Sequence, residues 1–470
     1  MYRHLEFRKG LGHPQKLLPA PMTTAIQSDV GRLRVPGFPR PLAGPLLLLL
    51  CALCSALPSF GYSVLTHEAI IDAEWDDHIQ PLLLRRFPNA TPEQLREAHA
   101  YAYGGCVIQD MGYYPFGSRF FSHLTHYVRS GDFVEALFEE SRDINDYAFA
   151  LGALSHYSAD VEGHSIAVNR SVALLYPRLH RRYGNWITWE ESPWAHSLAE
   201  FGFDTLEVVA QHSAPQAYRD WVGFRVSKPV LERAFKKTYG LELNDEILDV
   251  DLAVTLYRKF ANQVIPEMSE VAWALRRKQL EELASGIHHQ QLYHLSRQSY
   301  AAWRKYYTRP DVGDKVTAFV FRLLPKFGPL SAFDFHAPTL ETEQLFADSL
   351  KATVDAYNAE LSAVEAGKYD PVDMDLDTGH ATQPGEYLYC DRTYARLLHD
   401  LKRQHFVDVA AGLRDNLLSF YADSANDRLR RHRREWRSVT RDLSAFKAAC
   451  PSAESAPSIA ANVCLPASGH

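Results

Sequence analysis

The sequence has few cysteines, no excess of positive charge and few stretches with the pattern of a strand. Six cysteines among 470 residues exclude a disulfide scaffold and a cysteine-rich zinc finger. Basic side chains number 50 against 57 acidic ones, a formal charge of −7, so the chain lacks the basic character of a protein that coats nucleic acid. What it does have is 46% apolar residues, enough for a large core, and 21 histidines. A metal site in this chain is therefore expected to use imidazole and carboxylate ligands.

The first 61 residues have the features of a signal peptide. Residues 46–57 are almost entirely apolar, a stretch too short to span a bilayer but typical of the apolar region of a secretory signal. Basic residues precede this stretch, and small residues stand at the −3 and −1 positions of a cleavage site before Tyr62. The leader is long, which favours a start further downstream, for example at Met22. The alternative to a signal peptide is a buried N-terminal helix. We expect cleavage after residue 61, which leaves an acidic protein of formal charge −12 that is secreted or periplasmic.

The rest of the chain is predicted to be all-α. A threonine cap and a proline at the first helical position open a helix at residue 91 that ends at glycine near residue 105. Apolar residues three and four positions apart predict a buried helix from Asp143 to about residue 161. Further helices are expected over residues 227–240, 248–283, 284–307, 340–366, 391–424 and 426–448.

Histidines and carboxylates recur at helical spacing between residues 156 and 200. His156 and Asp160 are four residues apart, as are Asp160 and His164, and His196 and Glu200 repeat the spacing. Side chains four residues apart lie on one face of a helix, close enough to bind one ion or two neighbouring ions. Imidazole and carboxylate without thiolate favour zinc in a hydrolytic site, whereas the alternative is that these histidines only cap helices and pack. Upstream residues of the same types are His67, Asp110, His123 and His126.

In the order of these residues the sequence resembles the zinc-dependent phospholipase C family, which shares its fold with the zinc-dependent single-strand nucleases. The resemblance implies a multi-helical domain with three zinc ions and a ligand set of Tyr62, His67, Asp110, His126, His156, Asp160, His164, His196 and Glu200. Asp160 would bridge two ions. One of these ions would also be bound by Asp110, His126 and His156, and the other by His67 and the backbone of the N-terminal residue, Tyr62. The third ion would be bound by His164, His196 and Glu200.

Three features differ from the family pattern. Tyr62 stands where the family usually has tryptophan, a change that backbone ligation tolerates. Asp160 and His164 are two positions closer together than in the family, which leaves the geometry of the third site open. His123 competes with His126 for one ligand position, and the residues around His126 favour it.

The resemblance implies an exported phosphodiester hydrolase, a phospholipase C that cleaves phospholipids to diacylglycerol and a phosphorylated headgroup. Clustered zinc would lower the pKa of bound water and neutralise charge on the phosphoryl group. Asp110 is the residue expected to orient or deprotonate the attacking water. The alternatives are a single-strand nuclease or 3′-nucleotidase on the same metal site, and a non-catalytic, zinc-stabilised envelope protein.

The catalytic domain is expected over residues 62–270, after the leader of residues 1–61 and before a helical C-terminal region of residues 271–470. The expected partner is a phospholipid or another phosphodiester, with peripheral contact to a membrane surface. The acidic charge argues against a stable complex with nucleic acid, and no protein partner is predicted. Aromatic residues that follow Asp110 could surround a choline-like cation, stack on a base or form core: Tyr113, Tyr114, Phe116, Phe120 and Phe121.

Overall fold

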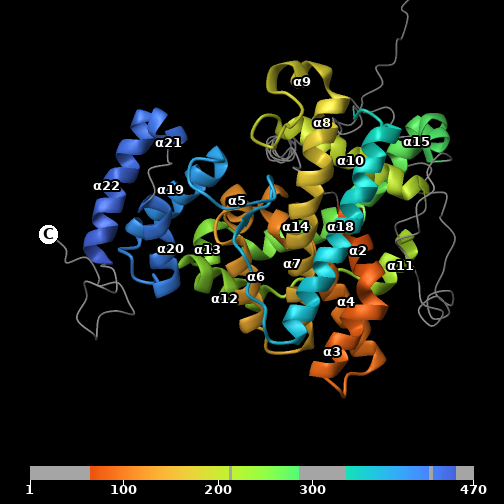
Figure 1. Ribbon diagram of the computed structural model, residues 1–470. Helices are drawn as coiled ribbons and strands as arrows, with labels where there is room; N and C mark the ends of the chain where they lie inside the picture. Colours follow the sequence, from red (N-terminus) through yellow and green to blue (C-terminus); the bar gives the residue numbers. More distant parts are fainter. Residues whose placement is uncertain (1–63, 211–213, 285–334, 423–426, 451–470) are drawn as a thin grey trace, which may run out of the picture. The chain divides into compact units, whose positions relative to one another are not determined.

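The computed structural model describes residues 64–210, 214–284, 335–422 and 427–450, which fold mainly into helices (Figure 1). The all-α prediction is confirmed: the only strands among the described residues form one short hairpin. The predicted signal peptide, Tyr62 and the predicted helix over residues 284–307 lie outside the described residues. None of the helices in the described ranges is long and apolar enough to cross a membrane.

The helical elements follow one another closely along the chain; η2 is a 3₁₀-helix, and η1, η3 and η4 are π-helices. The first twelve are α2 Val64–Glu74, η1 Trp75–Ile79, α3 Gln80–Arg86, α4 Pro92–Gly105, η2 Ile108–Tyr113, α5 Arg119–Tyr127, α6 Ser130–Glu139, α7 Ile144–Glu162, η3 Gly163–Val168, α8 Asn169–Leu175, α9 Pro177–Tyr183 and α10 Pro193–Ala210. The others are α11 Gln216–Val222, α12 Lys228–Tyr239, α13 Leu243–Glu246, α14 Val250–Lys259, η4 Phe260–Val264, α15 Ile265–Ala284, α18 Leu340–Glu365, α19 Leu388–Arg403, α20 Ala411–Ala422, α21 Asp427–Arg431 and α22 Arg433–Ala449. The strands are β1 Met374–Asp375 and β2 His380–Ala381.

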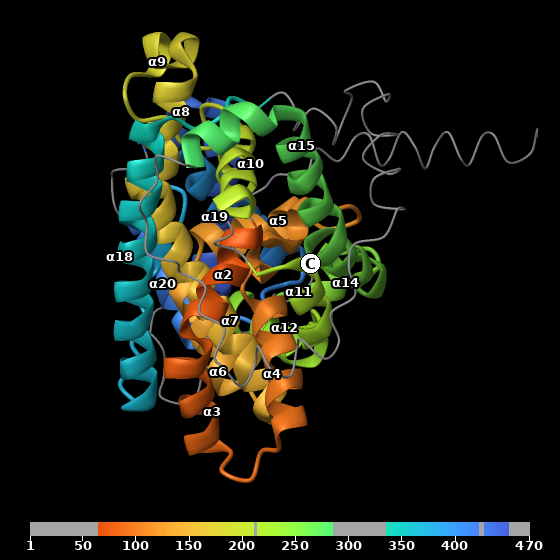
Figure 2. The ribbon, with the colours of Figure 1, turned by 90° about the vertical axis from the view of Figure 1, so that its right-hand side faces the viewer.

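Helix α7 is a central element of the core. Asp143 caps it by accepting hydrogen bonds from two backbone N–H groups of the first turn, and every residue from Asp146 to Asp160 is buried. The helix packs against α4, α6 and α18, and Figures 1 and 2 show α18 running beside it. Gly152 permits the close approach of α4, because a Cβ atom there would lie 2.1 Å from the carbonyl oxygen of Ala102. Polar side chains near the end of α7 therefore face the protein interior rather than solvent.

The end of α7 continues without a break into the π-helix η3 and then into α8 (Figure 2). A π-helix has a wider turn than an α-helix and is often found at functional sites. Asp160 lies in the last turn of α7, and His164 lies in η3. The altered helical turn therefore falls within the segment that supplies three predicted ligands.

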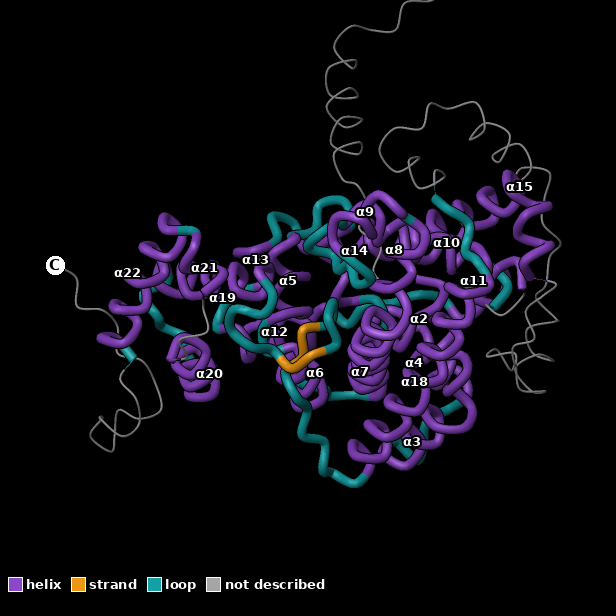
Figure 3. Tube along the Cα trace, turned by 45° about the horizontal axis from the view of Figure 1, so that its top comes forward, coloured by secondary structure: helices purple, strands orange, loops and turns teal. Residues whose placement is uncertain are grey.

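The β1–β2 hairpin, far along the chain, lies against helices of the N-terminal half (Figure 3). The backbone N–H of Leu376 donates to the carbonyl of His126 at 3.1 Å, and the Ser130 hydroxyl donates to the carbonyl of Met374 at 2.6 Å. Helix α19 packs on α5 in the same way. The expected boundary near residue 270 falls within α15, and the division into domains stays a prediction.

Most predicted helices are confirmed, but two are interrupted in the structure. The helix predicted over residues 426–448 is divided at His432 into α21 and α22, and the one predicted over residues 391–424 is also divided. The chain forms α19 and α20 with a break between them, where His405 and Phe406 both adopt a left-handed conformation with φ of 58°. The break buries Phe406 against Phe446 of α22, with the ring centroids 5.3 Å apart. Long-range packing thus overrides the local helical pattern, which contains no information about α22.

Gly379 allows a test of how closely the β1–β2 hairpin packs against α7. Its φ is +70°, and a Cβ atom would lie 2.6 Å from the carbonyl oxygen of Val161 in α7. Gly379→Ala should therefore destabilise the fold by roughly 2–4 kcal/mol, the sum of left-handed strain and a backbone clash. Gly367 is the matched control, because its φ is +64° but nothing lies within 4 Å of its Cβ position. Equal losses of thermal stability in the two alanine variants would contradict the close seating of the hairpin.

Candidate metal centre

Six elements bring eight of the nine predicted ligands into one buried region. The ninth, Tyr62, lies outside the described residues. The eight side chains are all buried, although each is polar. They are His67 from α2, Asp110 from η2, His126 from α5, His156 and Asp160 from α7, His164 from η3, and His196 and Glu200 from α10.

Asp160 occupies the middle of this region. Its Oδ2 atom lies 3.1 Å from Nε2 of His156 and 3.4 Å from Nε2 of His126. Its Oδ1 atom lies 3.5 Å from Nε2 of His67 and 3.9 Å from Nε2 of His164. The two oxygens of one carboxylate thus face different histidines, the arrangement expected of a bridging ligand.

The candidate ligand atoms form three groups, within each of which they lie no more than 4.8 Å apart. The group of His164, His196 and Glu200 is the set that the sequence resemblance implies for the third ion, and the group of Asp110, His126 and His156 contains the expected partners of Asp160. The remaining group contains Asp160 and His67, as expected, together with His156. The groups are Asp110, His126 and His156; His164, His196 and Glu200; and His67, His156 and Asp160.

Backbone carbonyls fix the orientation of three of these imidazole rings. Nδ1 of His126 lies 2.7 Å from the carbonyl oxygen of Ser122, and Nδ1 of His156 lies 3.0 Å from that of Cys106. In His196 the arrangement is reversed, with Nε2 lying 2.8 Å from the carbonyl oxygen of Ile187. A carbonyl can only accept, so each of these nitrogens carries the hydrogen. In the neutral ring the other nitrogen then presents a lone pair to the centre, as a metal ligand must.

Several ligand atoms that face the centre make no hydrogen bond among the described residues. Both carboxylate oxygens of Asp160 and of Glu200 lack one, as do Nε2 of His156 and Nδ1 of His164. Buried polar atoms are normally paired, because leaving one unpaired costs free energy. Zinc fits this donor set, since it binds imidazole nitrogen and carboxylate oxygen in enclosed sites.

The pKa shifts of His164, His196 and Glu200 agree with a site for a cation. Burial, together with the nearby Asp160 carboxylate, raises the pKa of Glu200 well above its ordinary value. Burial lowers the pKa of His164 to about 4 and that of His196 to about 3. Both rings are therefore neutral at neutral pH, the state in which they can bind a metal. A cation in this group would favour ionisation of Glu200.

The structure places His126, rather than His123, in the centre. Nε2 of His126 lies 3.3 Å from Oδ1 of Asp110, whereas the ring of His123 lies among Tyr113, Tyr127 and Tyr389. His123 also belongs to none of the three ligand groups found among the described residues. The geometry favours His126, and the assignment of ligands stays a prediction that metal analysis can test.

Asp204, which the sequence reasoning did not identify, positions the helix that bears His67. Its carboxylate accepts hydrogen bonds from the backbone N–H groups of Leu65 and Thr66 at 3.0 and 3.2 Å, and from the Thr66 hydroxyl at 2.9 Å. Asp204 lies one turn beyond Glu200 in α10. One helix thus provides ligands and also fixes the first turn of α2. Asp204 follows Glu200 by four residues, and this helical spacing could have identified it in the sequence.

Asp377 is a second residue that the sequence reasoning missed. Its Oδ2 atom accepts hydrogen bonds from the hydroxyls of Tyr127 at 2.8 Å and Tyr387 at 2.6 Å. Asn169 in α8 donates to the carbonyl of Asp377 at 2.8 Å. The C-terminal hairpin is thereby fixed beside the centre, a placement that only the tertiary structure reveals.

The aromatic residues after Asp110 have different roles. Tyr114, Phe120 and Phe121 are buried in the core, and Phe116 is exposed. Tyr113 lies beside the centre, with its ring centroid 5.9 Å from that of His126 and 5.9 Å from that of Trp189. Only Tyr113 among the five is thus placed to form a wall of the metal centre.

Comparison with known families agrees with this geometry. Residues 66–247 match the sequence model of the family described as zinc dependent phospholipase C. This segment belongs to that family. It contains all eight ligand candidates that the structure describes, and membership supports zinc binding and a phospholipase C-like, hydrolytic function. No curated protein and no solved structure matches the chain.

The ligand that lies between Asp110 and His156 in the sequence is either His126 or His123. Replacing each histidine in turn tests the assignment of ligands directly. His126→Ala should weaken zinc binding by at least about a hundredfold, because removing a ligand costs more than disturbing its supporting partners. His123→Ala is the matched control and should retain its zinc. Zinc content measured by elemental analysis after dialysis distinguishes the two variants, and the reverse pattern would transfer the ligand role to His123.

Proposed function

We propose that the chain is an exported zinc-dependent phosphodiester hydrolase with three zinc ions, a phospholipase C that cleaves phospholipids to diacylglycerol and a phosphorylated headgroup. The observation that supports this most is the set of buried histidines whose outer nitrogens face backbone carbonyls. The inner nitrogens of His126 and His156 lie 3.4 and 3.1 Å from Asp160, and that of His196 lies 3.4 Å from Glu200. The carboxylate oxygens of Asp160 and Glu200 make no hydrogen bond among the described residues. A core that only needed to pack would not bury so many orientated polar groups without partners.

Zinc bound in this centre would lower the pKa of water and neutralise charge on the phosphoryl group. Asp110 is buried, and its Oδ1 atom is available to accept a proton or to orient the attacking water. Tyr113 and Trp189 cover one side of the centre, and their rings would limit the entry of water. Export and cleavage before Tyr62 would free the N-terminal amine to complete the site of His67.

A contact with a membrane surface is supported by the segment 177–186. None of the residues of α9 is buried, and residues 180–186 are exposed without interruption. This segment contains Arg178, Arg181 and Arg182 together with Tyr183 and Trp186, and it contains no acidic residue. Basic and amphipathic aromatic side chains suit the interface of a bilayer with anionic lipids.

This exposed segment is joined directly to the metal centre. The residue after Trp186 is Ile187, whose carbonyl oxygen lies 2.8 Å from Nε2 of His196. The backbone N–H of Ile187 donates to the carbonyl of Asn169 at 3.0 Å. Docking of residues 177–186 on a bilayer would therefore bring lipid headgroups close to the group of His164, His196 and Glu200.

The proposed activity is tested with zinc-loaded protein on phosphatidylcholine vesicles. We expect release of phosphocholine and diacylglycerol, with loss of at least about a hundredfold in rate for Asp160→Asn, because that carboxylate would bridge two of the zinc ions. Cleavage of single-stranded DNA or of 3′-nucleotides without release of phosphocholine would favour the nuclease alternative. Bound zinc without hydrolysis of any phosphodiester would favour the non-catalytic alternative.

Charge reversal on α9 tests the membrane contact. Arg181→Glu should weaken binding to vesicles with phosphatidylserine by about fivefold or more, since each basic side chain near an anionic surface contributes roughly 1 kcal/mol. Lys368→Glu is the control, because Lys368 is also exposed but lies outside α9. Vesicle sedimentation measures binding, and equal effects of the two changes would show that net charge, rather than this segment, determines it.

A further inference from the structure

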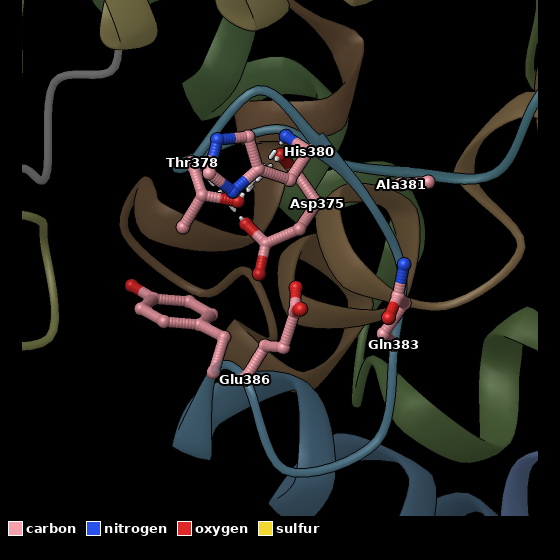
Figure 4. Close-up of a pocket in the computed structure, with 7 residues that line it drawn as sticks. Asp375, Thr378, His380, Ala381, Gln383 and Glu386 are labelled. Atoms are coloured by element: carbon pink, nitrogen blue, oxygen red, sulfur yellow. Dashed lines mark hydrogen bonds between the residues drawn. The ribbon is translucent and has the colours of Figure 1, made fainter.

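The loop between β1 and α19 encloses a pocket outside the segment that matches the family. The pocket has a volume of about 220 Å³ and is lined by Asp375, Thr378, His380, Ala381, Gln383, Glu386 and Tyr387 (Figure 4). Asp375 and His380 are paired across the two strands, so their side chains lie on the same face of the hairpin. No lysine or arginine is among the lining residues.

Asp375 is the pocket residue with a buried carboxylate oxygen that accepts no hydrogen bond among the described residues. It is only 3% exposed, and its Oδ1 atom accepts hydrogen bonds from the backbone N–H groups of Asp377 and Thr378 at 3.1 and 3.2 Å. Its Oδ2 atom is buried and has no hydrogen-bond partner among the described residues. Figure 4 shows the carboxylates of Asp375 and Glu386 turned toward one another. Two such carboxylates favour a positively charged group between them.

The size and lining of the pocket suit an organic cation better than a bare metal ion. None of the groups of potential metal ligands found in the described ranges includes Asp375, His380 or Glu386. The pocket is also several times larger than the roughly 30 Å³ that one water molecule occupies in the liquid. Tyr387 offers an aromatic ring, and its hydroxyl is held by Asp377 at 2.6 Å. A carboxylate with an aromatic face is the environment that recognises ammonium groups.

We propose that this pocket binds an ammonium group, through the charges of Asp375 and Glu386 and the ring of Tyr387. The group can belong to a lipid headgroup or to a free amine. Its origin in a lipid rests on the proposed function, whereas binding by the pocket does not. Tyr387 and Asp377 connect the pocket to Tyr127, which follows the ligand candidate His126 in α5.

The test uses the full chain loaded with zinc and choline chloride as the probe, titrated by calorimetry against sodium chloride at the same ionic strength. We expect saturable binding of choline, weakened at least tenfold by Asp375→Asn and by Glu386→Gln. The asparagine retains the oxygen that accepts the two backbone N–H groups, and Glu386 is exposed, so its variant should fold normally. Asp370→Asn is the control, because Asp370 is an exposed acidic residue of the same segment that does not line the pocket.

Kinetics of the same variants identify the source of the ammonium group. If the source is a lipid headgroup, both variants should raise KM for phosphatidylcholine and leave hydrolysis of bis-p-nitrophenyl phosphate, which has no cation, unchanged. Weakened choline binding with unchanged KM would support a free amine as the ligand. Absence of choline binding, or equal binding by the wild type and both variants, would overturn the pocket's assignment. Failure to hydrolyse either substrate would refute the proposed function, while the titration would still decide what the pocket binds.

Discussion

The carboxylate of Asp160 is fully buried, and the helices around it are arranged to accommodate its charge. A carboxylate removed from water is stable only if opposite charge or hydrogen bonds compensate for the lost hydration. Four histidines face the two oxygens of Asp160, and only Nε2 of His156, at 3.1 Å, lies within the usual hydrogen-bonding distance. Divalent cations between these groups would compensate the charge, and the histidines would then act as ligands rather than as donors.

Several features of the fold serve to assemble this centre. Burial of α7 on all sides encloses Asp160, and the π-helix that follows turns His164 toward the ligands of α10. Asp204 fixes the start of α2 near His67. The β1–β2 hairpin then binds to α5 beside His126, and Gly379 lets it approach the end of α7. Residues from widely separated parts of the chain thus support one site.

The sequence could predict those parts of the site that depend on local spacing. His156, Asp160 and His164, and also His196 and Glu200, are recognisable because residues four apart share a helix face whatever the tertiary structure. It could not predict the roles of Asp377 and Tyr387, which reach the centre only through packing of the hairpin on α5. The break between α19 and α20 has the same cause, because Phe406 turns inward to meet a helix that follows it in the chain.

Anomalous X-ray scattering at the zinc absorption edge, measured on crystals of the cleaved protein, would show directly whether zinc ions lie on either side of Asp160. We expect three anomalous peaks, one within each ligand group, with two of them on either side of Asp160. Crystals of the zinc-supplemented protein that showed no anomalous peak among His67, Asp160 and Glu200 would contradict this expectation.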